Sequence, residues 1–181
     1  MGVENNIAEG WIESEIGLIS NKITKGTTPS IKDGGYSQIG VNFLKAESLD
    51  GRGGILKNKL SFISEIIHEK FKRSQLEEND ILFSMAGVLG RTAIIKKENL
   101  PANTNQALSL IRPDTAKILP KYLLCYLQQK KIISFVNNST SQSAQPNINL
   151  QQIADISIVL PPLPEQKAIA KVLTAFDDKI E

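Results

Sequence analysis

The 181-residue chain has little of the chemistry that supports disulfides, metal sites or membrane insertion. It contains one cysteine, Cys125, and one histidine, His68. A single cysteine excludes an internal disulfide and suits a reducing cytoplasm, where we expect this protein to be. A lone histidine cannot build a metal site without partner ligands, so we predict no bound metal. No apolar run approaches the roughly 20 residues of a membrane helix, and the polar first nine residues do not resemble a signal peptide, so we expect no membrane partner.

Recognisable catalytic motifs are also missing. An adenine methyltransferase would carry Asn or Asp before a Pro-Pro-aromatic run, but Pro161 and Pro162 lie between leucines. The glycines of residues 50–54 lack the Gly-Lys-Ser/Thr ending of a phosphate loop. We therefore predict no cofactor and no active site on this chain. The alternative is a metal-dependent nuclease with a site built from Asp114 together with Asp177, Asp178 and Lys179.

The charges are nearly balanced, with 21 lysines and arginines against 19 acidic residues and a net charge of +2. That excess is too small to indicate nucleic acid by itself. Basic residues dominate from Arg112 to Lys131, which we interpret as a solvated helix face. The length suits one domain plus an appendage.

The C-terminal stretch changes character at its prolines. Alternating apolar residues over 156–160 predict a strand, which Pro161, Pro162 and Pro164 must end. Good helix formers follow. Four apolar residues of this helix are spaced 4, 3 and 4 apart, as in a coiled-coil seam: Ile169, Leu173, Phe176 and Ile180. We predict a helix that leaves the domain and supports self-association; the alternative is an amphipathic helix packed on its own domain.

Internal periodicity predicts further elements. Strands are expected over 41–44, 81–85, 92–95 and 108–112, with a glycine-containing turn over 86–90 joining two of them. Helices are expected over 63–75, with Ser64 as N-cap, and over 120–136.

Several short motifs, in order, resemble one family. They are Gly10-Trp11, Ile16-Gly17, the Gly26-Thr-Thr-Pro-Ser30 turn, Asn79-Asp-Ile-Leu82, Gly87-Val-Leu-Gly90 with Arg91, Asn105-Gln106, the stretch from Pro120 to Leu127, and the run from Leu160 to Ile180. Together they resemble a target recognition domain of the specificity subunit of type I restriction-modification systems. Asn79 stands where the family usually has glycine, a mild departure because asparagine tolerates left-handed backbone.

This resemblance implies an α+β fold with a mixed twisted sheet and flanking helices. The recognition domain would span residues 1–160, and residues 161–181 would form the proline hinge and the start of a long coiled-coil spacer helix. In the family two such domains stand in tandem with their spacer helices paired. The chain has half the family's usual length, which implies either a half-subunit that pairs with itself or a fragment.

The resemblance also implies a function without catalysis. The chain would read one half of a split target in double-stranded DNA and dock methyltransferase subunits, with the restriction subunit joining indirectly. A pure assembly or dimerisation module that does not read DNA remains the alternative.

Candidate DNA-binding residues carry hydroxyl, amide or cationic groups, which bond phosphates and base edges. Arg91 is the strongest single candidate, although a surface arginine on a hairpin is the alternative interpretation. For Asn105 and Gln106 we favour a role in holding neighbouring backbone. The full candidate set is Lys25, Thr27, Thr28, Ser30, Lys45, Ser84, Arg91, Thr92, Ser141, Gln142 and Gln145.

Overall fold

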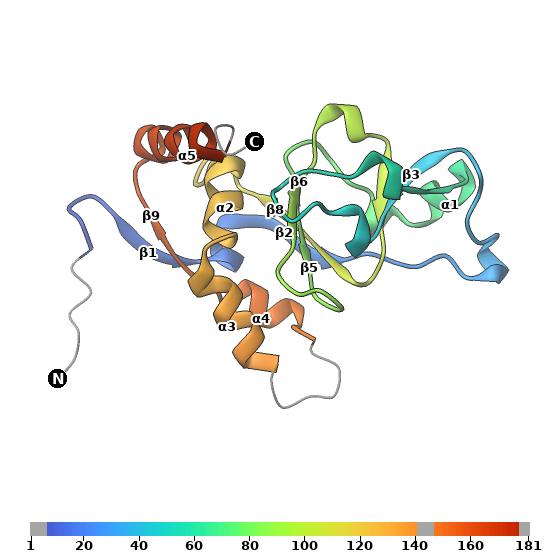
Figure 1. Cartoon of the computed structure of the whole chain (residues 1–181), viewed down its shortest axis with the longest axis horizontal. Helices are drawn as coiled ribbons and strands as arrows, with labels where there is room; N and C mark the ends of the chain where they lie inside the picture. The colour runs from blue at the N-terminus through green and yellow to red at the C-terminus, as the bar shows by residue number, and fades with distance from the viewer. Residues whose placement is uncertain (1–6, 141–146, 178–181) are drawn as a thin grey trace.

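A four-stranded antiparallel sheet lies at the centre of the folded domain (Figure 1). The structure is a computed structural model that describes residues 7–140 and 147–177. The strand order is β2 (Ser20–Lys25), β8 (Leu108–Pro113), β5 (Ile81–Ser84) and β6 (Thr92–Ile94). The predicted hairpin over 81–95 is confirmed, because β5 and β6 pair antiparallel.

Three helices cover one face of this sheet: α2 (Pro120–Leu127), α3 (Lys130–Thr140) and α4 (Leu150–Ala154). Side chains alternate across a strand, so Ile81 and Phe83 face the helices. The prediction of one helix over 120–136 was wrong. The chain turns at Gln128, whose amide N–H bonds back to Leu124 and whose side chain donates to Thr92 on β6 at 3.1 Å.

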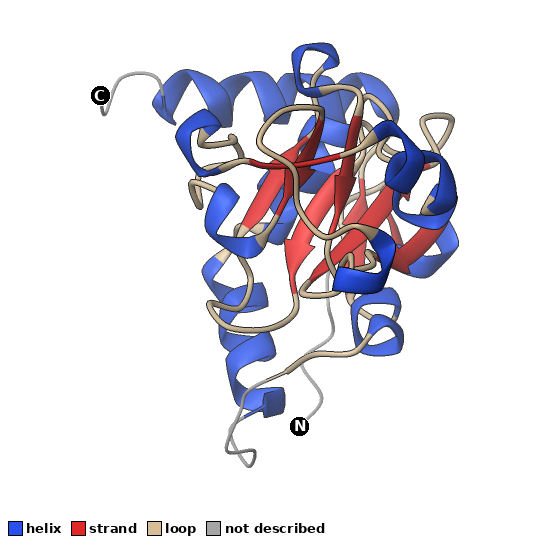
Figure 2. Cartoon of the chain, turned by 90° about the vertical axis from the view of Figure 1, so that its right-hand side faces the viewer, coloured by secondary structure: helices blue, strands red, loops and turns tan. Residues whose placement is uncertain are grey.

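A second sheet covers the opposite face of the central sheet. It has the order β4 (Ser61–Ile63), β3 (Val41–Leu44) and β7 (Ala102–Thr104). Leu44 of β3 packs in one buried cluster with Leu82 and Leu110 of the central sheet. The layers are therefore, in order, the helices α2 to α4, the central sheet and the second sheet. Figure 2 shows helices flanking the strands.

The helix α1 (Glu65–Lys70) packs on the outer face of this second sheet through Ile67 and through its C-cap residue, Phe71. Ser64 caps it as predicted, accepting a bond from the amide of Ile67 at 3.4 Å. The predicted range of 63–75 was too long, because α1 spans Glu65–Lys70 and a 3-10 turn, Lys72–Ser74, follows it. Ile63 belongs instead to β4.

A small separate sheet pairs β1 (Ile12–Glu15) with β9 (Ser157–Leu160), which confirms the predicted C-terminal strand. The other edge of β9 is held by α2. There the hydroxyls of Tyr122 and Tyr126 donate to the carbonyls of Val159 and Ser157 at 2.8 and 2.9 Å. Burial and the neighbouring Tyr126 raise the pKa of Tyr122 to about 12.

The helix α5 (Leu163–Asp177) starts one residue before Pro164, which fits in the first turn because its missing N–H has no partner to lose there. Gln166 is 1% exposed, and its amide bonds Leu119, Lys117 and Pro161 at 2.9 to 3.1 Å. The start of α5 is therefore anchored to the domain, and the predicted departure does not occur in this part of the helix.

The mixture of helices and sheets confirms the expected α+β class. Within the described ranges, none of the helices combines the length and apolarity needed to cross a bilayer.

Candidate nucleic-acid interface

Three motifs that are far apart in the sequence meet at one end of the central sheet. Because β2 is antiparallel to β8, and β5 is antiparallel to both β8 and β6, their adjoining loops lie at the same end. We call this region the loop end and define it as residues 25–30, 86–91 and 105–107. The family-like motifs at Gly26, Gly87 and Asn105 all lie there.

Two more segments reach the loop end. The amide of Asn105 donates to the carbonyl of Leu44 at 3.3 Å, which places Lys45 beside it. Asn147 pairs with Ala86, so the chain also passes the loop end directly after residues 141–146. The candidates Ser141, Gln142 and Gln145 lie within 141–146, outside the described residues.

Gly26 fixes the path of the first loop. A Cβ atom on Gly26 would lie 2.0 Å from the carbonyl oxygen of Thr104, so a side chain cannot be accommodated. The amide of Thr27 donates to that same carbonyl at 3.0 Å, and Arg73 Nη2 donates to the Thr27 hydroxyl at 3.0 Å. The turn is therefore held tightly against β7.

Gln106 holds the same loop from its other side. Its Oε1 accepts from the amide of Thr28 at 3.2 Å and from the Thr28 hydroxyl. The expected structural role of this glutamine is confirmed. It follows that the hydroxyls of Thr27 and Thr28, both candidate DNA ligands, already have partners inside the protein.

Ser30 shapes the end of the loop. Its hydroxyl donates to Asp33 Oδ2 at 2.6 Å and accepts from the Asp33 amide, closing a 3-10 turn, Ile31–Asp33. Lys70 binds the other carboxylate oxygen at 2.5 Å. The bonds from Lys70 and Ser30 hold the pKa of Asp33 below its ordinary value. Lys25, at the start of the loop, is exposed.

Ser84 and Thr92 have no exposed surface. The Ser84 hydroxyl donates to the Val88 carbonyl at 2.6 Å and accepts from the Arg91 amide at 2.8 Å, so it braces the glycine turn. Thr92 accepts from Gln128. We therefore assign both residues to the support of the fold and leave them out of the proposed DNA contacts.

Arg91 is half-buried at the base of the glycine turn. Its Nη1 donates to the carbonyl of Leu49 at 3.4 Å, which links the turn to the loop after β3. A guanidinium has five N–H donors, so this bond leaves donors for a ligand. Lys45 is more restricted, because it pairs with Glu47 at 2.8 Å and lies 5.6 Å from the ring centre of Tyr36.

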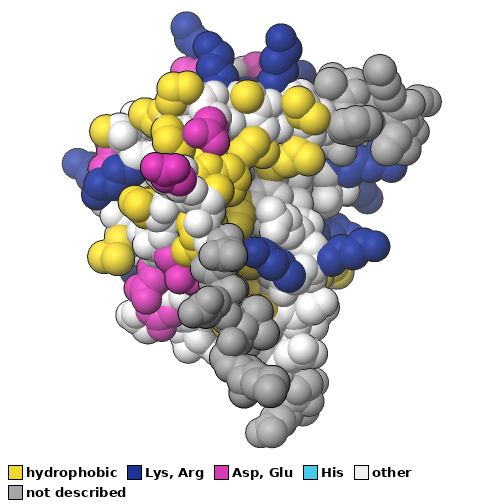
Figure 3. All heavy atoms as spheres, turned by 90° about the vertical axis from the view of Figure 1, so that its left-hand side faces the viewer, with side chains coloured by type: hydrophobic (Ala, Val, Ile, Leu, Met, Phe, Trp, Pro, Cys, Tyr) yellow, Lys and Arg dark blue, Asp and Glu magenta, His cyan; other side chains and the backbone are white. Residues whose placement is uncertain are grey.

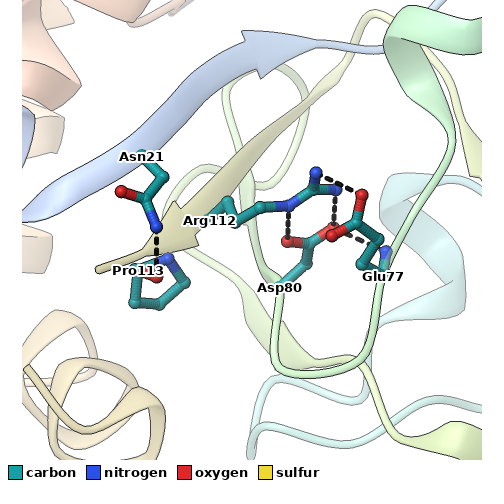
Figure 4. A network of polar contacts seen from close by, with 5 residues as sticks. All are labelled: Asn21, Glu77, Asp80, Arg112 and Pro113. Atoms are coloured by element: carbon teal, nitrogen blue, oxygen red, sulfur yellow. Dashed lines mark hydrogen bonds and ion pairs between the residues drawn. The ribbon is translucent and has the colours of Figure 1, made fainter. Parts of the chain in front are cut away.

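Arg112 lies at the opposite end of the sheet from the loop end. Figure 4 shows its side chain directed toward Asp80 and Glu77. Its Nε and Nη2 bind both oxygens of Asp80 at 2.8 and 2.9 Å, and Nη1 binds Glu77 at 2.5 Å. Asp80, fully buried, and Glu77 raise the pKa of Arg112. The charge of Arg112 is therefore used within the fold.

The nuclease alternative gains no support from the described residues, among which no group of three or more potential ligands is placed to hold a metal. Asp114 instead accepts from the amide of Ala116 at 3.1 Å and pairs with Lys117. Asp178 and Lys179 lie outside the described ranges.

The predicted seam of α5 is partly described. Ile169 packs against the main core, whereas Leu173 is 41% exposed. Phe176 belongs to α5, and Ile180 lies outside the described residues. Figure 3 shows hydrophobic side chains gathered on the face that carries β1, β9 and α5.

Comparison with known proteins identifies the family of this chain. The family model for the type I restriction modification DNA specificity domain matches residues 8–181. The EcoBI specificity subunit of Escherichia coli is 27% identical over 178 residues, covering 97% of this chain and 37% of the relative. The MjaX specificity subunit of Methanocaldococcus jannaschii is 35% identical over 184 residues, covering 96% of this chain and 41% of the relative. The chain thus spans about two fifths of these relatives' length.

Solved structures show the same fold. The HsdS subunit from Thermoanaerobacter tengcongensis superposes with a TM-score of 0.74 at 17% identity, covering 98% of this chain and 44% of that one. The S subunit from M. genitalium gives 0.62 at 18% identity, covering 98% and 41%. Sequence, fold and the convergence of motifs agree, and the chain belongs to the family of type I restriction-modification DNA specificity domains.

Proposed function

We propose that this chain is a non-catalytic DNA-recognition component that reads one half of a split duplex target. The observation that carries the proposal is the convergence of three distant motifs at the loop end. Loops on a rigid sheet are the common location of binding residues. Lys25 and Arg73 supply exposed positive charge there, and Arg91 supplies further donors.

We further propose that methyltransferase subunits dock on this chain and that a restriction subunit joins through them. The relatives are named specificity subunits, and one structural neighbour, with a TM-score of 0.73, comes from work on complex assembly of the type I R-M system. The division into a recognition domain over 1–160 and a spacer segment over 161–181 belongs to this proposal. Its support is the exposed Leu173 beyond the anchored start of α5.

Titration of duplex binding against salt tests the proposal. The chain, alone and with its methyltransferase subunit, should bind duplex with an affinity that falls steeply as salt rises, because cations on DNA release counterions. An assembly module would bind no duplex at any salt concentration, and that result would refute DNA recognition.

The variant Arg91→Ala tests whether Arg91 contacts the duplex. We expect about a tenfold loss of duplex affinity at fixed salt, the order of a lost bond to a charged group, while the domain stays folded. Lys171→Ala on α5 is the matched control and should leave affinity unchanged. Unchanged affinity in Arg91→Ala would remove Arg91 from the interface.

A further inference from the structure

The backbone of residues 26–28 is held between the side chains of Gln106 and Arg73. The groups of these side chains that bond no described residue are hydrogen-bond donors only. Gln106 reaches this backbone from the turn after β7, and Arg73 reaches it from the 3-10 turn after α1. Both side chains are exposed, and neither is among the candidates drawn from the sequence.

The orientation of the Gln106 amide is fixed by chemistry. A backbone N–H can only donate, so the atom facing the Thr28 amide must be the oxygen. That oxygen also accepts from the Thr28 hydroxyl, which uses both of its lone pairs. The Nε2 group therefore keeps two hydrogens, and it makes no bond to any residue within 7–140 or 147–177.

Because both lone pairs of Gln106 Oε1 are used, this side chain can offer DNA only hydrogen-bond donors. Glutamine reads adenine by pairing its oxygen and its nitrogen with the base together, and here the oxygen is occupied. A phosphate oxygen accepts hydrogen bonds and donates none, which complements an amide with only donors left. Arg73 has the same character with a positive charge. Among the residues that the structure describes, its guanidinium bonds through Nη2 alone, to Thr27 at 3.0 Å and to Gly26 at 3.5 Å.

We propose that Arg73 and Gln106 together bind one phosphodiester group of the DNA backbone across the Thr27–Thr28 peptide. This inference rests on the proposed function and adds a site to it. A contact of this kind fixes the register of the protein on the duplex and carries no base preference. Base choice then belongs to other residues of the loop end.

A scan with neutral phosphate analogues tests the site. The probe is a duplex that the wild-type chain binds, synthesised with a single methylphosphonate at each position in turn. We expect neutralisation to lower wild-type affinity at several positions, because several cations face the duplex, and to lower it by about tenfold at the phosphate held by Arg73 and Gln106, the order of a lost bond to a charged group. Gln106→Glu should bind the unmodified duplex about tenfold more weakly and lose nothing further at that position.

The Gln106→Glu variant is chosen because a carboxylate still accepts both Thr28 bonds but has no N–H donors. Its melting temperature should match the wild type, which separates a lost contact from a disturbed loop. Arg73→Met should lose sensitivity at the same methylphosphonate position, and Lys171→Ala should keep it.

Several results would overturn the inference while leaving DNA recognition intact. One is a wild-type scan whose sensitive positions stay sensitive in Gln106→Glu and Arg73→Met. Another is a Gln106→Glu variant that prefers a different base pair, which would make this residue a base reader. Competition by millimolar inorganic phosphate at constant ionic strength would indicate a site for free phosphate. A wild-type chain that binds no duplex would instead refute the proposed function itself.

Discussion

Arg112 is a residue whose charge stabilises the fold and is not available to a ligand. Its partner Asp80 has no exposed surface, and it also accepts from the amide of Glu77 at 2.7 Å. A buried carboxylate that loses its cation is left uncompensated, which costs more than the pair itself contributes.

Replacing Arg112 by methionine should therefore lower the free energy of unfolding by about 3 kcal/mol or more in urea denaturation. The double variant Arg112→Met with Asp80→Asn should recover part of that loss, because no charge remains buried. A single variant within experimental error of the wild type would contradict the role given to this pair.

Tyr122 should make the stability of the protein sensitive to alkaline pH. Its pKa is raised to about 12, so the folded state keeps the hydroxyl neutral where the unfolded chain, with an ordinary pKa near 10, ionises. The stabilisation is full below pH 10 and is lost as the pH rises toward 12. The stability gap between wild type and Tyr122→Phe should narrow over that range; a constant gap would contradict this assignment.

Residue types alone could not separate ligands from structural supports. Asn79 was expected to tolerate left-handed backbone, and its φ of 72° agrees. Ser84 and Thr92, by contrast, carry hydroxyls that suit DNA equally well and are buried. Which hydroxyl is buried depends on strand pairing, and that is set by contacts between distant parts of the chain.

At the scale of elements, hydrophobic spacing located the strands better than it located helix ends. The strand over 41–44 was predicted with the bounds that the structure shows. Its apolar side chains pack into two different buried clusters, so apolar residues stand out in the sequence there. The break at Gln128 was missed because the apolar residues on both sides of it continue the same buried face. Periodicity reports the face of a helix, whereas side-chain bonds such as Gln128 to Thr92 decide where it stops.

The helix α5 carries the prediction about association. Its start is anchored through Gln166, while Val172 and Leu173 are 55% and 41% exposed. We expect the wild-type chain to self-associate in light scattering and Leu173→Asp to shift it toward monomer, since a carboxylate cannot be buried in an apolar seam. Lys171→Asp, on an exposed position, is the control. A strictly monomeric wild type would refute association through this helix.

At the scale of the whole molecule, the family resemblance predicted the fold class but not the position of the site. The motifs at Gly26, Gly87 and Asn105 are widely separated in the sequence, and only the antiparallel order of β2, β8, β5 and β6 brings them together. Gln106 and Arg73 could not be recognised as neighbours, because their common partner is the loop over residues 26–28.

We propose that the loop end reads duplex DNA. The most direct test of this function is selection of duplexes from a random pool by the purified chain, with and without its methyltransferase subunit. We predict enrichment of a short motif, and a mirrored pair of motifs at fixed spacing if two copies associate. Absence of enrichment under both conditions would contradict DNA reading and favour an assembly module.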